Sequence, residues 1–426
     1  MGERQTAHYA QYLKILEEEL IPAMGCTEPI AVALAAAKAR EALGTLPDTC
    51  RVEVSGNIIK NVKAVTVPNT GGMKGLEAAA TAGIVGGRPD LDLQVLSHVS
   101  QDEIAEMGRF LQNCTMQVLP AHNGKVFYIL VTLSAMGHTA SCEIVDFHTN
   151  ITCIQRDGQC LFKKENGQAA QPAQTDRSCL NVEEIVAFAD CLSPEDVAPV
   201  LERQIAYNTA ISQEGIRGGW GAEVGRTLLD LYGENVPVRL RAVAAAGSDA
   251  RMNGCELPVI IVSGSGNQGM TASLPVIAYS EVIGASHDTL LRALAVSDLI
   301  TIHQKTGIGR LSAFCGATSA GCGAACGIAY LDGGRADLIS RTIINTLGIC
   351  SGMVCDGAKS SCAAKIAAAV DAGLNGYQMA KAHLGFAAGE GIIGSNVEQT
   401  IENVGRMARY GMRETDAEIL NIMLGL

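Results

Sequence analysis

The stretch GMVCDGAKSSCAAKIAAAV, at residues 352–370, indicates that the C-terminal half of the chain is helical. Its Ala-rich second part favours a helix over 358–370, and the Asp-Gly step after Cys355 places that cysteine in the turn before it. A thiol there lies near the positive end of a helix, which stabilises a thiolate. Within one straight helix, the Cα atoms of Cys355 and Cys362 would be about 10 Å apart. On spacing alone, two buried cysteines on one helix face are a slightly simpler explanation than a metal site.

Gly- and Ala-rich helical sequence surrounds this stretch, from residue 179 to the C-terminus. Within it, Asn181 precedes a helix with Glu184 in the capping-box position, and Ser193 followed by Pro194 opens the next helix. The sequence therefore predicts a mostly helical second half.

Earlier residues have a different pattern, in which β-branched residues and alternation predict strands separated by helices. The strands are predicted within 51–65, 125–135 and 140–155, and the helices within 71–87 and 100–113. Polar residues with proline and no periodicity follow at 165–178, which is typical of a linker.

We therefore predict an α+β fold that combines a mixed α/β domain with a mostly α-helical, Gly/Ala-rich catalytic domain. The α/β domain covers 49–164, the linker 165–178 and the helical catalytic domain 179–426. Residues 1–48 are expected to form N-terminal helices that carry a cysteine loop and pack on the catalytic domain.

Composition narrows the classes of partner. The net charge is −12, which argues against nucleic acid or an anionic membrane surface as a partner. Residues 257–280 and 311–331 lack charge, but they are rich in Gly, Ser, Thr and Asn, as buried segments are and membrane spans are not. The 15 cysteines include no Cys-x-x-Cys pair, and the N-terminus does not read as a secretory signal. We expect a cytoplasmic protein with reduced thiols.

A second cysteine motif lies near the N-terminus, in IPAMGCTEP at 21–29. Helices are predicted at 7–20 and from Pro29 to the glycine at position 44, so Cys26 lies just before a helix, where its thiolate is favoured. The Cys26 thiol could act as a general base or a nucleophile. Glu28 could be a catalytic or orienting carboxylate, or a first-turn residue that serves the helix dipole.

The sequence GSGNQG at 264–269 matches the dinucleotide-binding pattern, but no second strand completes a βαβ unit. A Gly-rich substrate loop is therefore the preferred interpretation, with Asn267, Gln268 and backbone amides binding a carboxylate.

Other polar residues could bind an amino-acid substrate, although turn chemistry or packing explains each of them as well. They are Asn57, Asn69, Thr70 and His303. The same holds for His138 and His148 on predicted strands, for which packing is the simpler explanation.

Taken together, these motifs resemble the family of iron–sulfur L-cysteine desulfidases and their uncharacterised relatives, which is related to the α chain of bacterial L-serine dehydratases. The resemblance covers nearly the full length. It rests on GCTEP at 25–29, VSGNIIKNVKAVTVPNTGG at 54–72, SGSGNQG at 263–269, LSAFCG at 311–316 and CDGAKSSC at 355–362.

The resemblance implies a [4Fe–4S] cluster held by Cys315, Cys355 and Cys362, with Cys26 as the base that faces it. Two further cysteines depart from the family pattern, and either of them could replace Cys315 as a ligand. They are Cys322 and Cys326.

The implied reaction is a β-elimination without pyridoxal phosphate, in which a carbon–sulfur lyase converts L-cysteine to sulfide, pyruvate and ammonia. One alternative is an L-serine or other hydroxy-amino-acid dehydratase on the same scaffold. Another is a non-enzymatic protein that binds a small molecule and whose cysteines only pack. We expect a small amino acid as the partner, no nucleic acid or membrane, and a homodimer, the commonest oligomer.

Overall fold

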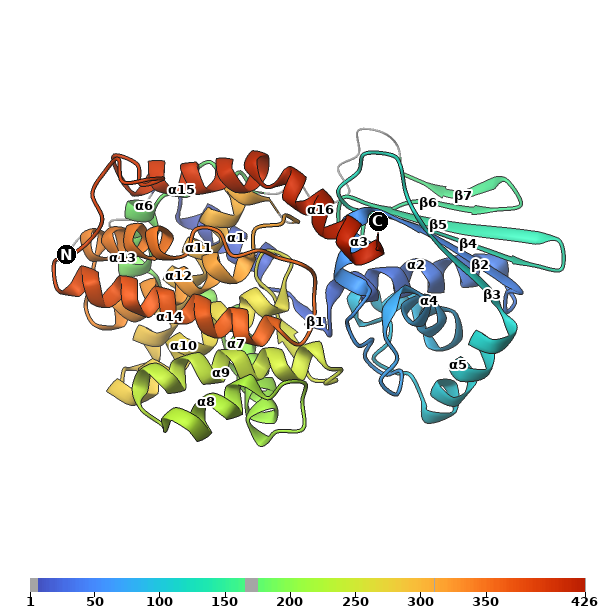
Figure 1. Cartoon of the computed structure of the whole chain (residues 1–426), viewed down its shortest axis with the longest axis horizontal. Coiled ribbons are helices and arrows are strands. Elements are labelled where there is room, and N and C mark those ends of the chain that lie inside the picture. The colour runs from blue at the N-terminus through green and yellow to red at the C-terminus, as the bar shows by residue number, and fades with distance from the viewer. Residues whose placement is uncertain (1–6, 165–174, 310, 426) are drawn as a thin grey trace.

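The computed structural model describes residues 7–164, 175–309 and 311–425, and it contains a helical part and an α/β part that lie side by side (Figure 1). A mixed sheet belongs to the α/β part, and the larger part is built of helices. The predicted α+β class is therefore confirmed.

The sheet has six strands in the order β3-β2-β4-β5-β6-β7. The strands are β2 (Thr49–Val54), β3 (Thr115–Pro120), β4 (Tyr128–Ala135), β5 (His138–Val145), β6 (Ile151–Arg156) and β7 (Gln159–Lys163). Only the β2–β3 pair is parallel, and the other neighbours are antiparallel. Alternate residues of β4 are buried because one face of the sheet is covered by helices.

Those helices are α2 (Thr27–Leu43), α4 (Gly75–Gly86) and α5 (Gln101–Asn113). Ala-rich α2 contacts α4, β4 and β5. The two helices pack so closely that a Cβ on Gly83 would lie 2.1 Å from the carbonyl oxygen of Ala33. Helix α2 therefore packs in the α/β part, because its small side chains fit closely against α4 and the sheet.

The strand predicted within 51–65 ends early. Only Thr49–Val54 is extended, and Gly56–Val62 forms helix α3. The reason is the burial of Ile58, Ile59 and Val62, since adjacent and i, i+3 positions can share a helix face but lie on opposite faces of a strand. A short 3-10 segment, η1 (Pro89–Gln94), precedes α5.

The helical part is the larger of the two. It contains α1 (Tyr9–Glu19), α6 (Val182–Cys191), α7 (Pro194–Arg217), α8 (Val224–Tyr232), α9 (Val236–Met252), α10 (Gly266–Ile283), α11 (His287–Ile308), α12 (Gly316–Leu331), α13 (Ala336–Ile349), α14 (Cys362–Lys381), α15 (Val397–Arg406) and the π-helical turn η2 (Met407–Gly411). Helix α12 lies at its centre, since α10, α11, α13 and α14 all contact it and every residue from Ala317 to Leu331 is buried. The helix predicted over 358–370 begins only at Cys362, so Cys355 lies in a longer loop than expected.

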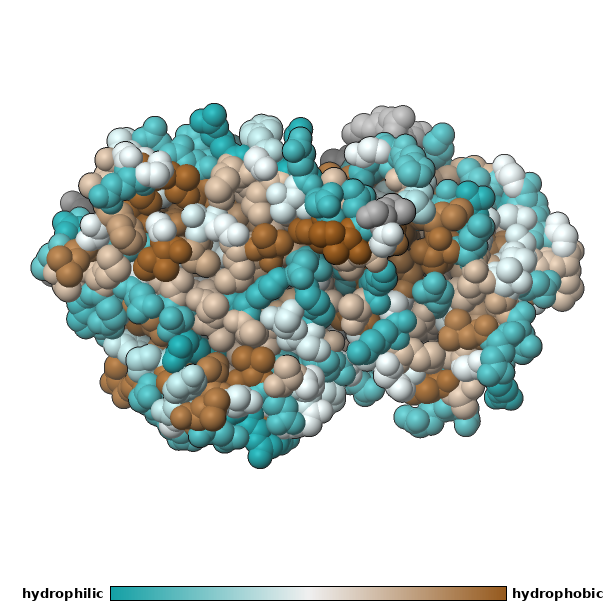
Figure 2. Space-filling view, viewed as in Figure 1, coloured by the Kyte–Doolittle hydropathy of each residue, from teal (hydrophilic) through white to brown (hydrophobic). Residues whose placement is uncertain are grey.

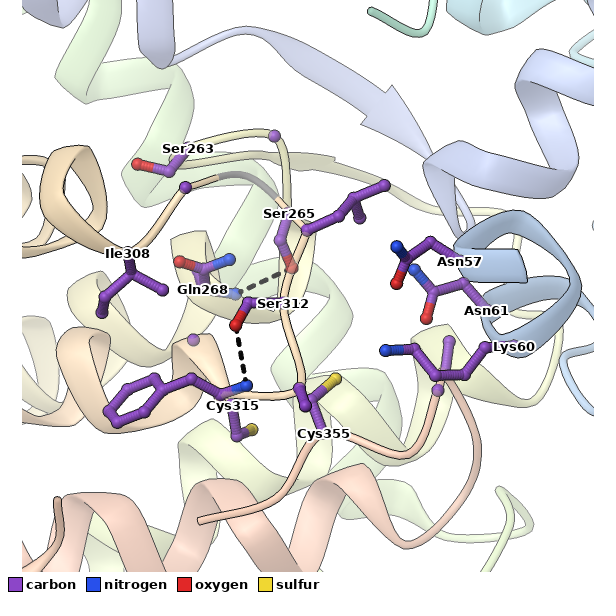
Figure 3. Close-up of a pocket in the computed structure, with 18 of the residues that line it drawn as sticks. Asn57, Lys60, Asn61, Ser263, Ser265, Gln268, Ile308, Ser312, Cys315 and Cys355 are labelled. Carbon is purple, nitrogen blue, oxygen red and sulfur yellow. Dashed lines mark hydrogen bonds between the residues drawn. The ribbon is translucent and has the colours of Figure 1, made fainter. Parts of the chain in front are cut away.

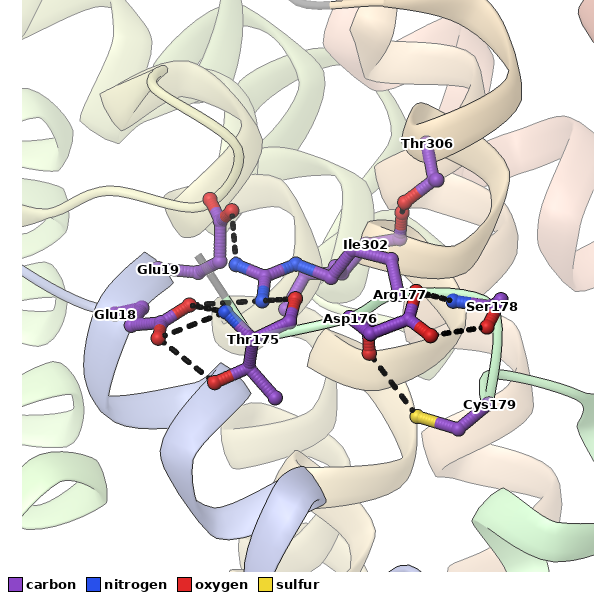
Figure 4. Close-up of polar contacts among 9 residues, drawn as sticks. All are labelled: Glu18, Glu19, Thr175, Asp176, Arg177, Ser178, Cys179, Ile302 and Thr306. Carbon is purple, nitrogen blue, oxygen red and sulfur yellow. Dashed lines mark hydrogen bonds and ion pairs between the residues drawn. The ribbon is translucent and has the colours of Figure 1, made fainter. Parts of the chain in front are cut away.

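The N-terminal helix α1 is tied to the chain that follows the sheet (Figure 4). Arg177 donates to Glu18 at 2.8 Å and to Glu19 at 3.0 Å, and the Thr175 hydroxyl donates to Glu18 at 2.8 Å. Most of the predicted linker, residues 165–174, lies outside the described residues, but its end is thus held on α1. Helix α1 itself contacts α7 and α11, so this part of 1–48 does pack on the helical part.

The last helix, α16 (Arg413–Leu424), returns to the α/β part and contacts α3, as Figure 1 shows near the C-terminus. A short antiparallel ribbon, β1 (Pro22–Met24) with β8 (Pro258–Ile260), also brings distant segments together. The predicted boundary at 179 therefore does not separate two independent units.

None of the described helices is long and apolar enough to cross a membrane. On the face drawn in Figure 2, hydrophobic side chains form separate patches between hydrophilic ones.

Candidate functional site

A cavity of about 480 Å³ lies where the helical part meets α2, α3 and the sheet. Most of the predicted site residues line it. They are Cys26, Glu28, Asn57, Asn267, Gln268, Cys315, Cys355 and Cys362. Segments more than 300 residues apart in the sequence thus form one site.

Two of the thiols are brought together by a single antiparallel bridge, between Phe314 and Val354. The amide of Cys315 donates to the carbonyl of Met353 at 2.9 Å, and the amide of Cys355 donates to the carbonyl of Ala313 at 2.6 Å. Figure 3 shows both side chains beside the cavity, with Lys60 across from Cys355. The backbone therefore fixes this pair of thiols before any ligand binds.

The two thiols share a hydrogen bond and have opposite pKa shifts. Accepting from Cys315, together with the nearby charges of Lys60 and Lys365, lowers the pKa of Cys355 to about 6, although burial opposes this. Donating to Cys355, and burial, raise the pKa of Cys315. Cys355 is therefore the thiolate of the pair at neutral pH.

The third thiol, Cys362, is the first residue of α14 and lies 3.6 Å from the carbonyl oxygen of Gly357. Three thiols lining one cavity, one of them held as a thiolate, are a donor set that suits an iron–sulfur cluster. Among the described residues, no three His, Cys, Asp or Glu side chains are arranged to hold a single metal ion.

The two extra cysteines lie elsewhere. Cys322 and Cys326 are fully buried in α12, where they interact with each other, and neither lines the cavity. Their positions favour Cys315 over either of them as the first ligand.

Cys26 and Glu28 form a hydrogen-bonded pair at the start of α2. The Cys26 thiol donates to Glu28 Oε2 at 3.1 Å, and the Asn61 amide donates to Glu28 Oε1 at 3.0 Å. The Thr27 hydroxyl lies 3.1 Å from Glu28 Oε2 and 3.2 Å from the carbonyl oxygen of Gly264. Glu28 therefore has acceptor contacts to three side chains, which fix its orientation.

The pKa shifts of this pair differ from the expectation. Burial, and next the charge of Glu28, raise the pKa of Cys26, so the helix N-terminus does not suffice to hold a thiolate there. Burial also acts to raise the pKa of Glu28, but the charge of His148 and the hydrogen bond from Cys26 outweigh it and hold that pKa below its usual range. The resting pair is a neutral thiol on an ionised carboxylate.

Several helices begin at this cavity. Residues at the start of α2, α10, α12 and α14 all line it. The thiols of Cys26 and Cys315 occupy N-cap positions without capping their helices, and α14 also has no side-chain cap. The positive ends of these helix dipoles thus converge on the cavity, which favours a negatively charged ligand.

Several cations in the lining were not singled out from the sequence, and four of them lie on or next to the elements that carry the site residues. These four are Lys60, Arg251, Lys305 and Lys365. The side chain of Lys60 is only 2% exposed and pairs with Asp416 of α16. A lysine within the apolar run NIIKNV and an arginine within an Ala-rich helix were the signals that could have found the first two, since buried charges need a reason.

Three predicted substrate residues lie outside the cavity lining and form hydrogen bonds elsewhere. The Asn69 amide donates to the carbonyl oxygen of Leu96 at 2.7 Å, and the Thr70 hydroxyl donates to that of Val67 at 2.7 Å. His303 pairs with Glu398 at 2.7 Å. The structure therefore does not bring these three residues together with the other predicted site residues, and their contacts fit turn chemistry and packing.

The two strand histidines separate. His148 lies after β5, lines the cavity and lowers the pKa of Glu28, so it belongs to the site. His138 bonds to Asp157 at 2.8 Å on the exposed edge of a hairpin.

Fold and cavity together define a two-part protein with a cysteine-lined, anion-attracting site. The chain belongs to the serine dehydratase alpha chain family, whose model matches residues 90–421. The predicted relation to the L-serine dehydratase α chain is thereby confirmed. The match includes the three candidate ligands and begins after the Cys26 loop.

Similar chains carry the name "UPF0597 protein". That of Desulfitobacterium hafniense (strain Y51) is 54% identical over 422 residues, which cover 99% of this chain and 98% of the relative. That of Lachnoclostridium phytofermentans is 50% identical over 416 residues, or 98% of this chain and 100% of the relative. That of Treponema denticola is 44% identical over 422 residues, or 98% of each.

Proposed function

We propose that this protein is an iron–sulfur L-cysteine desulfidase, a lyase that eliminates sulfide from L-cysteine without pyridoxal phosphate. Membership in the serine dehydratase alpha chain family points to a lyase. The observation that carries the proposal is one cavity that combines the Cys26–Glu28 proton pair with the thiols of Cys315, Cys355 and Cys362.

These three cysteines would hold a [4Fe–4S] cluster. When bound, it would supply an open iron as a Lewis acid for the leaving sulfur. Lys60 and Lys365 contribute positive charge beside Cys355, which favours the thiolate form that such a ligand needs.

The Cys26–Glu28 pair moves the α-proton in this proposal. Cys26 passes its own proton to Glu28 Oε2, 3.1 Å away, and its sulfur takes the proton from the substrate α-carbon. The electron pair of the broken C–H bond forms the Cα–Cβ double bond, and hydrosulfide leaves from the β-carbon. The enamine product becomes an imine and takes up water, which gives pyruvate and ammonia.

Sulfide and pyruvate release after anaerobic iron–sulfur reconstitution tests the proposal. Cys26→Ala should keep its iron content and lose most of its sulfide release, because the proton acceptor is gone. Cys142→Ala is the matched control, since this cysteine is buried in β5 and lies outside the lining. Full sulfide release by an iron-loaded Cys26→Ala protein would contradict the assigned role. Wild-type protein that holds no iron and makes no product would instead favour the alternative of a non-enzymatic protein that binds a small molecule.

A second candidate is an L-serine or related hydroxy-amino-acid dehydratase, which the family name favours. The same residues would move the same proton, and only the leaving group differs. Comparing kcat/KM for L-cysteine and L-serine at equal iron content separates the two, since the dehydratase releases pyruvate from L-serine faster than sulfide from L-cysteine.

We further propose a cytoplasmic homodimer that acts on a small amino acid, with neither nucleic acid nor membrane as a partner. The net charge of −12 supports the exclusion of anionic partners. Light scattering after gel filtration measures the oligomeric state, and a monomer mass would contradict the homodimer.

A further inference from the structure

Arg251 is a buried cation that lines the cavity, and it has no role in the mechanism proposed above. It lies in the last turn of α9, is 2% exposed and contributes to the cavity lining. Its Nη1 donates to Asn267 Oδ1 at 3.1 Å, and its Nε has no hydrogen-bond partner. In the described part of the chain, no carboxylate forms an ion pair with it.

A buried guanidinium without a paired anion is costly, since taking a charge out of water costs several kcal/mol, which only a partner offsets. Glu28 is the carboxylate whose charge acts on Arg251, but its oxygens accept hydrogen bonds from Cys26 and Asn61 instead. The cavity therefore leaves a place for one more negative charge at Arg251, and an occupant of the cavity can supply it.

The glycine-rich turn before α10 is built around this side chain. A Cβ on Gly266 would lie 2.5 Å from Arg251 Nε, so a larger residue there would displace the guanidinium. The glycine places the N-terminus of α10 directly on the arginine. Arg251 is close enough to interact electrostatically with Cys26, Glu28 and Cys362, so the guanidinium lies near both the proton pair and one candidate ligand.

Two acceptor atoms complete the set of unpaired groups around the cavity. Gln268 Oε1 and Asn57 Oδ1 belong to lining residues, are buried and have no hydrogen-bond partner. Figure 3 shows both side chains bordering the same pocket. One unpaired cation and two unpaired acceptors are complementary to a carboxylate and an ammonium group.

We propose that Arg251 binds the α-carboxylate of an α-amino-acid substrate, while Gln268 and Asn57 accept hydrogen bonds from its ammonium group. This inference rests on the proposed function in taking an amino acid as the substrate. The planar guanidinium binds a carboxylate through two parallel hydrogen bonds, which a lysine cannot reproduce. A carboxylate held there brings the α-carbon next to the Cys26 thiol.

Calorimetric titration of the iron-loaded protein with two inert ligands tests this assignment. L-Alanine has both charged groups but no leaving group, and L-alaninamide lacks the carboxylate. Wild-type protein should bind L-alanine about 10- to 100-fold more tightly than L-alaninamide, the usual range for a charge-assisted hydrogen bond. In Arg251→Met this ratio should fall to near one, with L-alaninamide affinity unchanged, and Arg251→Lys should be intermediate.

Arg241→Met is the matched control. This arginine lies on the same helix and pairs with Asp371 at 3.0 Å, outside the cavity lining. It should keep the wild-type ratio. Unchanged L-alaninamide binding in Arg251→Met also shows that the variant is folded.

A wild-type ratio that persists in Arg251→Met would overturn the assignment. The same holds if that variant loses iron but keeps the ratio, since the guanidinium would then serve the cluster. Failure of the proposed function differs from both results: wild-type protein would make no sulfide or pyruvate, while its L-alanine binding still depended on Arg251. Wild-type protein that does not bind L-alanine would overturn the assignment as well.

Discussion

Replacing the buried carboxyl of Asp298 with an amide should stabilise the protein, increasingly so at higher pH. Asp298 lies in α11, and its Oδ1 accepts from Gln204 Nε2 of α7 at 3.0 Å while its Oδ2 has no partner. Burial raises the pKa of Asp298 from 3.8 to about 8, against the opposing effect of the Gln204 hydrogen bond. Asparagine keeps the acceptor for Gln204 and never ionises.

The magnitude follows from linkage. Because the folded protein holds the Asp298 proton more tightly than the unfolded chain, this contribution is fully present below about pH 4 and is lost as the pH rises to about 8. Each pH unit within this interval lowers the free energy of unfolding of the wild-type protein by about 1.4 kcal/mol, which gives roughly 5–6 kcal/mol in total. The stability advantage of the Asp298→Asn protein over wild type should therefore grow by about 1.4 kcal/mol per pH unit up to pH 8 and stay constant above it.

Guanidinium unfolding at pH 6, 7, 8 and 9, followed by the fluorescence of the single tryptophan, measures this difference. That residue, Trp220, packs in the helical part, where Asp298 also lies. Asp288→Asn, at an exposed position of the same helix, is the control and should stay within about 0.5 kcal/mol of wild type. An advantage of Asp298→Asn that does not grow between pH 6 and 8 would refute the reasoning.

Three further predictions concern the cavity. Glu28→Gln should lower sulfide release by about 10²- to 10⁴-fold at unchanged iron content, because the amide cannot take the Cys26 proton; a smaller loss in steady-state assays would speak against the pair. Cys355→Ser should lose iron after reconstitution and Cys322→Ala should keep it, as metal analysis will show; equal iron contents would remove Cys355 from the ligand set. Asp416→Asn should loosen α16, which buries no residue of its own and loses its ion pair with Lys60, so limited proteolysis should cut there faster than in wild type. An unchanged cutting rate would mean that other contacts hold the helix.

Local sequence signals predicted many of the helices and strands, because these signals act over short distances. The helix that ends at Gly44 does so in the left-handed conformation expected for glycine, with φ of 84°. Ser100 and Glu103 form the capping box that starts α5. Asn181 caps α6 as expected.

What the sequence could not predict depends on long-range packing. The Thr27 hydroxyl contacts the carbonyl oxygen of Gly264, 237 residues away, and no sequence pattern near either residue predicts this contact. Lys60 is buried only because α16 returns across α3 and supplies Asp416. The pKa of Cys26 also could not be predicted, since the helix N-terminus favours its thiolate and the depth of burial, which opposes it, is a property of the whole fold.

The cysteines at helix starts carry the most general signal. Ser, Thr, Asp or Asn normally occupies an N-cap because its side-chain oxygen bonds to the first amides. Here Cys26 and Cys315 occupy N-caps without doing so, and Cys362 is the first residue of its helix. Helices α2 and α12 thus each give up a side-chain capping contribution of about 1 kcal/mol, while α14 begins with a thiol. Because all three lie at one cavity, the lost capping is best explained by a bound group that needs both the thiols and the positive helix ends.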